Sequence, residues 1–166
     1  MTLIALTVNN VSGQGEGFPV MMADILITSR IGDYSMPTPT YLEGAKEIFS
    51  TTKDLKPFGL SQKLYVINDH LCVALGGSVA QMTTFLNQLR VIYDTTDFDR
   101  DDVVKFAIKF QEEEGTKLDA IILTAKPAEY GHHFQVRGIG SLRQIESELY
   151  GNVVAGGSGA AANCFR

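Results

Sequence analysis

Two helical segments stand next to each other in the middle of this chain, and strand-like runs lie on both sides of them. The first helix is predicted over 78–93, where Ser78 can cap its N-terminus. The second is predicted over 101–114, where acidic residues open the helix and Gly115 ends it. Apolar residues recur at helical spacing in both segments: Val79, Met82, Leu86, Leu89 and Tyr93, then Val103, Val104, Ala107 and Ile108. Because each helix has one apolar stripe, the two are expected to pack together, antiparallel, on one outer face of the domain.

Runs of apolar and β-branched residues predict strands before and after the helices. These runs are 2–8, 18–28, the two halves of 63–77 on either side of Asn68-Asp69, 118–125, 133–140 and 151–157. The order of strands, two helices and strands indicates an α+β domain of stacked antiparallel sheets and excludes a parallel βαβ protein. The chain of 166 residues suits a single domain, 1–166. Within it, 29–61 contains three prolines and only short apolar clusters, which predicts an inserted surface segment.

Composition narrows the classes of function. A net charge of −5 argues against general nucleic-acid binding. No apolar run reaches the roughly 18 residues of a membrane helix, so no membrane partner is expected. Cys72 and Cys164 are far apart and lack CxxC spacing, and the N-terminus does not resemble a signal peptide. The chain is therefore expected in the cytoplasm, without disulfides.

Thr2 raises the main chemical hypothesis, because one removable residue precedes it. A threonine hydroxyl is a weak nucleophile and needs a nearby base. A free α-amine on the same residue can be that base, since its ordinary pKa is about 8. Most chains that begin Met-Thr have no such role, so the interpretation depends on companion residues elsewhere in the sequence.

Three companions give the hypothesis weight. Asp24 is an acid in an apolar run, and Lys63 heads another strand. A buried pair of the two beside the N-terminus would orient the site and favour the deprotonated hydroxyl. Gly76-Gly77 lies between a strand and a helix, where backbone N–H groups can stabilise an oxyanion.

The other reactive side chains do not indicate a second functional site. His132 and His133 are adjacent in a predicted strand and would face opposite sides, so no metal site is expected. Cys72 is interpreted as a small core residue, and His70 as an exposed turn residue. The sequence contains no phosphate-binding loop, and no cofactor is expected.

The residues resemble the proteasome β-subunit family, which has the N-terminal-nucleophile hydrolase fold and includes the bacterial HslV-like peptidases. The closest stretch is "QKLYVINDHLCVALGGSVAQMTTFLNQLR", which follows the family's lysine, strand, turn, strand, glycine pair and first helix. "TLIALTV", "MADILITS", "LDAIILTA" and "VVAGGSG" are similar to its other segments. The resemblance implies an αββα four-layer sandwich of antiparallel sheets, incomplete at the C-terminus of this sequence.

The resemblance also implies a set of roles. Thr2 matches the nucleophile, Asp24 and Lys63 the buried pair, and Gly77 the oxyanion-hole amide. Thr28 matches a position that binds the substrate backbone, and Ser158 matches an accessory polar residue. The implied activity is that of a threonine-type peptidase subunit acting on peptides or proteins within a ring-shaped homo-oligomer.

Departures from the family leave other functions open. Leu26 stands where many proteasome subunits have arginine, and the segment between Thr28 and Lys63 is much longer than the family's connection. A catalytically silent assembly subunit of the same fold is one alternative, and an amidohydrolase acting on small amides is another. Removal of Met1 discriminates the first alternative from the peptidase, because the mechanism requires a free amine on Thr2.

Overall fold

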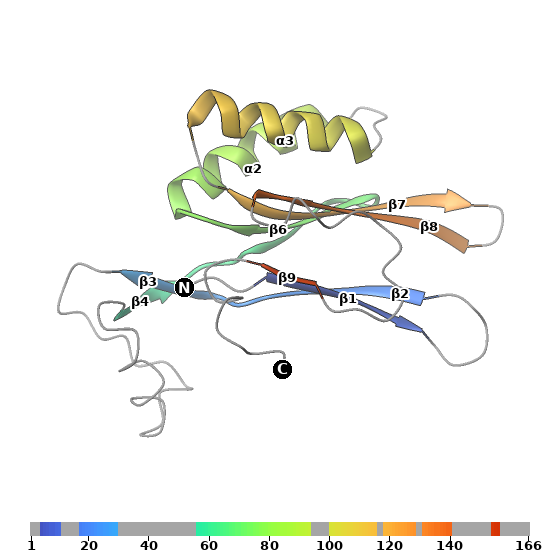
Figure 1. The fold of residues 1–166 in the computed structure, drawn as a ribbon, viewed down its shortest axis with the longest axis horizontal. Helices are drawn as coiled ribbons and strands as arrows, with labels where there is room; N and C mark the ends of the chain where they lie inside the picture. Colours follow the sequence, from blue (N-terminus) through green and yellow to red (C-terminus); the bar gives the residue numbers. More distant parts are fainter. Residues whose placement is uncertain are drawn as a thin grey trace, which may run out of the picture.

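The fold has three layers, one of helices and two of sheet (Figure 1). A computed structural model of the chain describes residues 4–10, 17–29, 56–93, 100–115, 118–128, 131–140 and 154–156. The helical layer consists of α2 (Val79–Tyr93) and α3 (Arg100–Glu114), which begin and end within one residue of their predicted bounds. They lie together on one outer face, as their apolar stripes predict.

The strands form two larger sheets and a small ribbon. The middle layer is an antiparallel sheet in the order β5 (Leu64–Asn68), β6 (Leu71–Gly76), β7 (Asp119–Ala128) and β8 (Gly131–Ile139). The other sheet places β1 (Ile4–Asn10) between β2 (Gly17–Ala23) and β9 (Val154–Gly156), again antiparallel. The ribbon pairs β3 (Leu26–Ser29) with β4 (Lys56–Leu60). The predicted α+β class with stacked antiparallel sheets is therefore confirmed for the part of the chain that the structure describes.

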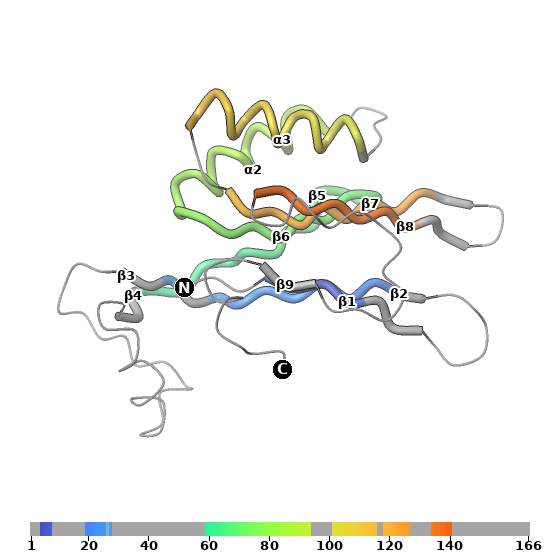
Figure 2. Tube along the Cα trace, viewed as in Figure 1, coloured from blue at the N-terminus to red at the C-terminus, as the bar shows by residue number. Residues whose placement is uncertain are grey.

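The middle sheet is covered on both faces, which explains why its central strands are almost continuously apolar. Figure 2 shows it between the helices and the sheet of β1. Side chains alternate along β6, so that Val73 and Leu75 pack under the helices while Ala74 faces the other sheet. Phe85 of α2 is fully buried and stacks on Phe106 of α3, with ring centroids 5.4 Å apart.

A second apolar cluster fills the space between the sheets. Its fully buried members are Ile4, Leu6, Ala74 and Ile121, joined by Val136, which is 7% exposed. Ile4 and Leu6 come from the first strand of the chain and Ile121 from β7. This cluster therefore fixes the start of β1 against the middle sheet.

Two features of the fold differ from the expectations. The run 18–28 is not one strand, because it breaks at Asp24-Ile25 into β2 and β3. The Ile25 carbonyl accepts a hydrogen bond from Ser61 N at 2.8 Å, so the chain leaves the first sheet there and pairs with β4. The residues of β4 lie in the predicted surface segment 29–61 and form a strand that was not expected there, whereas residues 30–55 of that segment lie outside the described residues.

Smaller differences concern single positions and the fourth layer. Val79, predicted in the buried stripe of α2, is 41% exposed, and Phe85 occupies the core beside the remaining predicted members. The second helical layer of the expected four-layer sandwich is not among the residues that the structure describes. In that part of the chain, neither helix has the length and apolar character needed to cross a bilayer.

Gly140 and Gly115 provide a matched test of the packing at the end of β8. Both have a positive φ, of 82° and 58°. A Cβ on Gly140 would lie 2.5 Å from both the Leu118 carbonyl oxygen and Asp119 Oδ1, whereas a Cβ on Gly115 would meet nothing within 4 Å. Gly115→Ala should lower the free energy of unfolding by about 1 kcal/mol, the cost of a left-handed backbone. Gly140→Ala should lower it by about 2–5 kcal/mol, because overpacking is added. Urea denaturation measures both, and equal losses would contradict the predicted close contact.

Candidate active site

The ends of four strands meet at one end of the two stacked sheets. Ile4 begins β1 and is paired with Ala23, the last residue of β2, so Asp24 follows directly beside the head of β1. Lys63 immediately precedes β5, and its carbonyl accepts a hydrogen bond from Leu75 N at 2.8 Å. This contact places Lys63 beside the end of β6, where the Gly76-Gly77 turn begins.

An ion pair joins the two sheets at this end. Lys63 Nζ donates a hydrogen bond to Asp24 Oδ1 across 39 residues of sequence. The Lys63 side chain is 2% exposed and that of Asp24 is 24% exposed. Burial removes most of the hydration of the ammonium, so the carboxylate has to compensate for it. The predicted contact between Asp24 and Lys63 is confirmed, and the catalytic role assigned to the pair stays a prediction.

The turn after β6 has the geometry of a glycine position. Gly77 has a φ of 148°, a conformation that other residues rarely adopt. Ser78 then caps α2: its hydroxyl accepts a hydrogen bond from Gln81 N at 3.3 Å, and its carbonyl accepts one from Met82 N at 3.0 Å. The Gly77 amide therefore lies directly before a helix N-terminus, on an exposed residue. Helix dipole and backbone N–H groups at such a position favour a negative charge.

The structure brings together part of the predicted site. Asp24 and Lys63 are in contact, and Gly77 lies two residues beyond Leu75, which is bonded to Lys63. Thr28 lies in β3, opposite Pro57 in the register of the ribbon. Thr2 and Ser158 fall outside the residues that the structure describes, and their place in the site stays a prediction.

Two polar residues around Lys63, Gln62 and Tyr65, were not predicted from the sequence as part of the site. Tyr65 Oη donates a hydrogen bond to the Gln62 carbonyl, and Gln62 Nε2 donates one to the Leu64 carbonyl at 2.5 Å. Both bonds are local to the chain around Lys63. Only their proximity in sequence to Lys63 could have indicated them, because tyrosine and glutamine are ordinary residues at the start of a strand.

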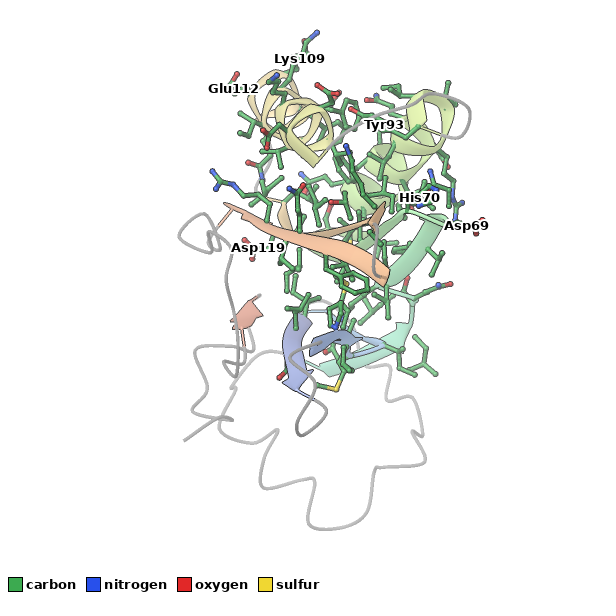
Figure 3. All side chains as sticks on the ribbon, turned by 90° about the vertical axis from the view of Figure 1, so that its right-hand side faces the viewer. Asp69, His70, Tyr93, Lys109, Glu112 and Asp119 are labelled. Atoms are coloured by element: carbon green, nitrogen blue, oxygen red, sulfur yellow. The ribbon has the colours of Figure 1, made fainter. Side chains whose placement is uncertain are left out.

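The other reactive side chains lie apart from the ion pair. His70 and Asp69 form the turn at the opposite end of β5, on the same side of the molecule as Tyr93 (Figure 3). There His70 Nδ1 lies 3.0 Å from the Ala125 carbonyl. Burial raises the pKa of the Cys72 thiol, which disfavours the nucleophilic thiolate. Within the described ranges, no group of three or more His, Cys, Asp and Glu side chains could hold a metal ion.

Comparison with known proteins finds similarity among solved structures. No protein-family model matches the chain, and no curated protein matches it. Among solved structures, the chain is similar to the eukaryotic HslV from Trypanosoma brucei, with a TM-score of 0.45 and 15% identity. That similarity covers 96% of this chain and 72% of the other. The interpretation of the site therefore rests on this chain's own residues.

The ion pair makes a clear prediction for stability. Asp24→Ala should lower the free energy of unfolding by about 3 kcal/mol, near the low end for a broken buried pair because Asp24 keeps some exposure. The double variant Asp24→Ala/Lys63→Met should recover most of this loss, since no ammonium is then buried without its partner. Glu113→Ala is the surface control: Glu113 is 64% exposed and lies 3.5 Å from Lys109, so its loss should change the free energy of unfolding by less than about 0.5 kcal/mol.

Thermal and urea unfolding of the four proteins would measure these differences. A double variant as unstable as Asp24→Ala would show that the loss comes from altered packing at residue 24. The electrostatic account of the pair would then be wrong.

Proposed function

We propose that this chain is an N-terminal-nucleophile hydrolase that cleaves peptide bonds, with Thr2 as the nucleophile after removal of Met1. The observation that carries the proposal is the Asp24–Lys63 pair, whose ammonium is buried beside the head of the first strand. A buried cation at this point has a use in the chemistry as well as in the fold, because it stabilises negative charge developing on a nearby hydroxyl.

Covalent geometry supports the choice of Thr2. Two residues of extended chain span at most about 7 Å, so Thr2 is tethered within that distance of Ile4. Ile4 is opposite Ala23, the residue before Asp24. Asp24 in turn holds the Lys63 ammonium. This tether is short enough to allow the hydroxyl and the amine of residue 2 to approach the ion pair, and we propose that they do.

The proposed reaction proceeds through an ester on the threonine. The Thr2 hydroxyl oxygen bonds to the peptide carbonyl carbon, and the hydroxyl proton passes to the α-amine of the same residue. The Gly77 N–H donates a hydrogen bond to the oxyanion that forms. When the C–N bond breaks, the protonated amine returns its proton to the leaving amine. Water then attacks the ester with the α-amine again as base, which releases the acid and restores Thr2.

The remaining roles follow from the family resemblance. Thr28 would bind the substrate backbone, and Ser158 would belong to the polar network around the nucleophile. Peptide or protein substrates and a ring-shaped homo-oligomer are part of the same proposal. A ring that encloses its sites would restrict hydrolysis to chains that can enter it.

An electrophile that needs both groups of Thr2 tests the proposal. Intact mass of natively expressed protein should show the loss of Met1, and a peptide epoxyketone should add once per chain. The reagent closes a ring with both the hydroxyl and the adjacent amine, so it reports the pair that the mechanism uses. Thr2→Ala should abolish labelling and peptide hydrolysis while leaving the thermal midpoint nearly unchanged.

Thr7→Ala is the matched control, because Thr7 lies in β1 and pairs with Val20, away from the N-terminal end of that strand. It should be labelled as the natural sequence is. Retained Met1 without labelling would contradict the peptidase and favour a silent assembly subunit. Labelling without hydrolysis of any peptide, combined with turnover of a small amide, would instead favour an amidohydrolase.

A further inference from the structure

We propose that Tyr65 and Gln62 are positioning residues for the Lys63 ammonium, an inference that rests on the proposed function. Neither side chain contacts Asp24 in the interactions that the structure shows. Their hydrogen bonds instead hold the main chain on both sides of Lys63, and this fixes where its side chain begins.

The first pair of bonds brackets Lys63 locally. Tyr65 Oη donates to the carbonyl of Gln62, the residue before Lys63. Gln62 Nε2 donates at 2.5 Å to the carbonyl of Leu64, the residue after it. The peptide group that precedes Lys63 and the one that follows Leu64 are thus each held by a side chain from this short segment.

A second pair of bonds ties the same segment to its surroundings. The Lys63 carbonyl accepts a hydrogen bond from Leu75 N at 2.8 Å, which fixes the position of Lys63 relative to β6. Ser61 N donates a hydrogen bond to the Ile25 carbonyl at 2.8 Å, which fixes the segment beside the residue that follows Asp24. We call residues 61–65 the lysine brace. It has direct hydrogen bonds to β6 and to the residue that follows Asp24, the partner of the ammonium.

The brace matters because lysine is a flexible point charge. Four methylene groups, joined by rotatable bonds, separate its Cα from Nζ, and the ammonium has no planar geometry that would orient it. Its effect on a nearby nucleophile falls with distance, so small displacements of the main chain change the reaction rate. A fixed backbone at Lys63 removes one source of that displacement.

A substitution at Tyr65 can test one hydrogen bond of the lysine brace without changing the packing. Its ring packs against the core under the helices. Tyr65→Phe keeps the ring and removes only the hydroxyl that bonds Gln62. Loss of one such bond should lower kcat on a peptide amide substrate roughly three- to tenfold, with KM unchanged. In protein with ¹³C-labelled lysine, the Lys63 ε-carbon resonance should shift, because the ammonium moves relative to Asp24.

Tyr93→Phe is the matched control. Tyr93 belongs to the same core under the helices, yet it lies at the end of α2, beside the turn remote from Lys63. This control should leave kcat, KM and the Lys63 resonance unchanged. Gln62→Ala should reproduce the effects of Tyr65→Phe in the same direction, because it loosens the other side of the brace.

The outcomes separate this inference from the proposed function. If Thr2→Ala is inactive but Tyr65→Phe keeps its full kcat and its Lys63 resonance, the brace has no positioning role and the peptidase stands. If the natural sequence neither hydrolyses peptides nor takes the epoxyketone, the proposed function fails. The Lys63 resonance then decides alone: an unchanged resonance in Tyr65→Phe overturns the positioning role, and a shifted one supports it.

Discussion

The ammonium of Lys63 is buried where the two sheets meet, and its carboxylate partner comes from the other sheet. A charge that has lost its hydration is stable only while its counter-charge stays in contact. The pair therefore restrains the end of β2 against the start of β5 and allows little sliding between the sheets there. Between the sheets, non-directional attraction comes from the apolar cluster of Ile4, Leu6, Ala74, Ile121 and Val136. The ion pair adds one specific contact, which fixes where the two sheets lie relative to each other at this end.

The same contact shapes the local course of the chain. At Asp24 the strand that pairs with β1 ends, because the side chain turns to Lys63 and the next carbonyl bonds Ser61 N. Two residues later the chain enters a different sheet, the ribbon of β3 and β4. One acidic residue thus marks the point at which a hairpin becomes two separate pairings.

The elements that depend on local pattern could be predicted from the sequence. Helical periodicity located α2 and α3, and the turn at Asn68-Asp69 located β5 and β6. The break at Asp24 was missed because its cause lies 39 residues away, at Lys63, where no local pattern shows it. β4 was missed because Pro57 and Gly59 resemble loop residues. Among the described strands β4 pairs only with β3, so the missing N–H of Pro57 is tolerated as on any edge strand.

The site was predictable to a similar degree. Residue type and order suggested Asp24, Lys63 and Gly77, and the contact of the first two follows from the fold. Gln62 and Tyr65 act through backbone carbonyls, and sequence patterns carry no information on which carbonyl a side chain reaches.

The ribbon has a consequence for how this sequence can vary. Ser29 and Lys56 are register partners, so both ends of residues 30–55 are held side by side whatever lies between them. Loop-closure entropy grows only with the logarithm of length, and doubling such a connection costs about 0.6 kcal/mol. A longer or shorter connection would therefore change the cost of closing the chain at the ribbon only slightly. By holding the two ends of the connection together, the ribbon keeps its length from altering the geometry of the ion pair through chain closure.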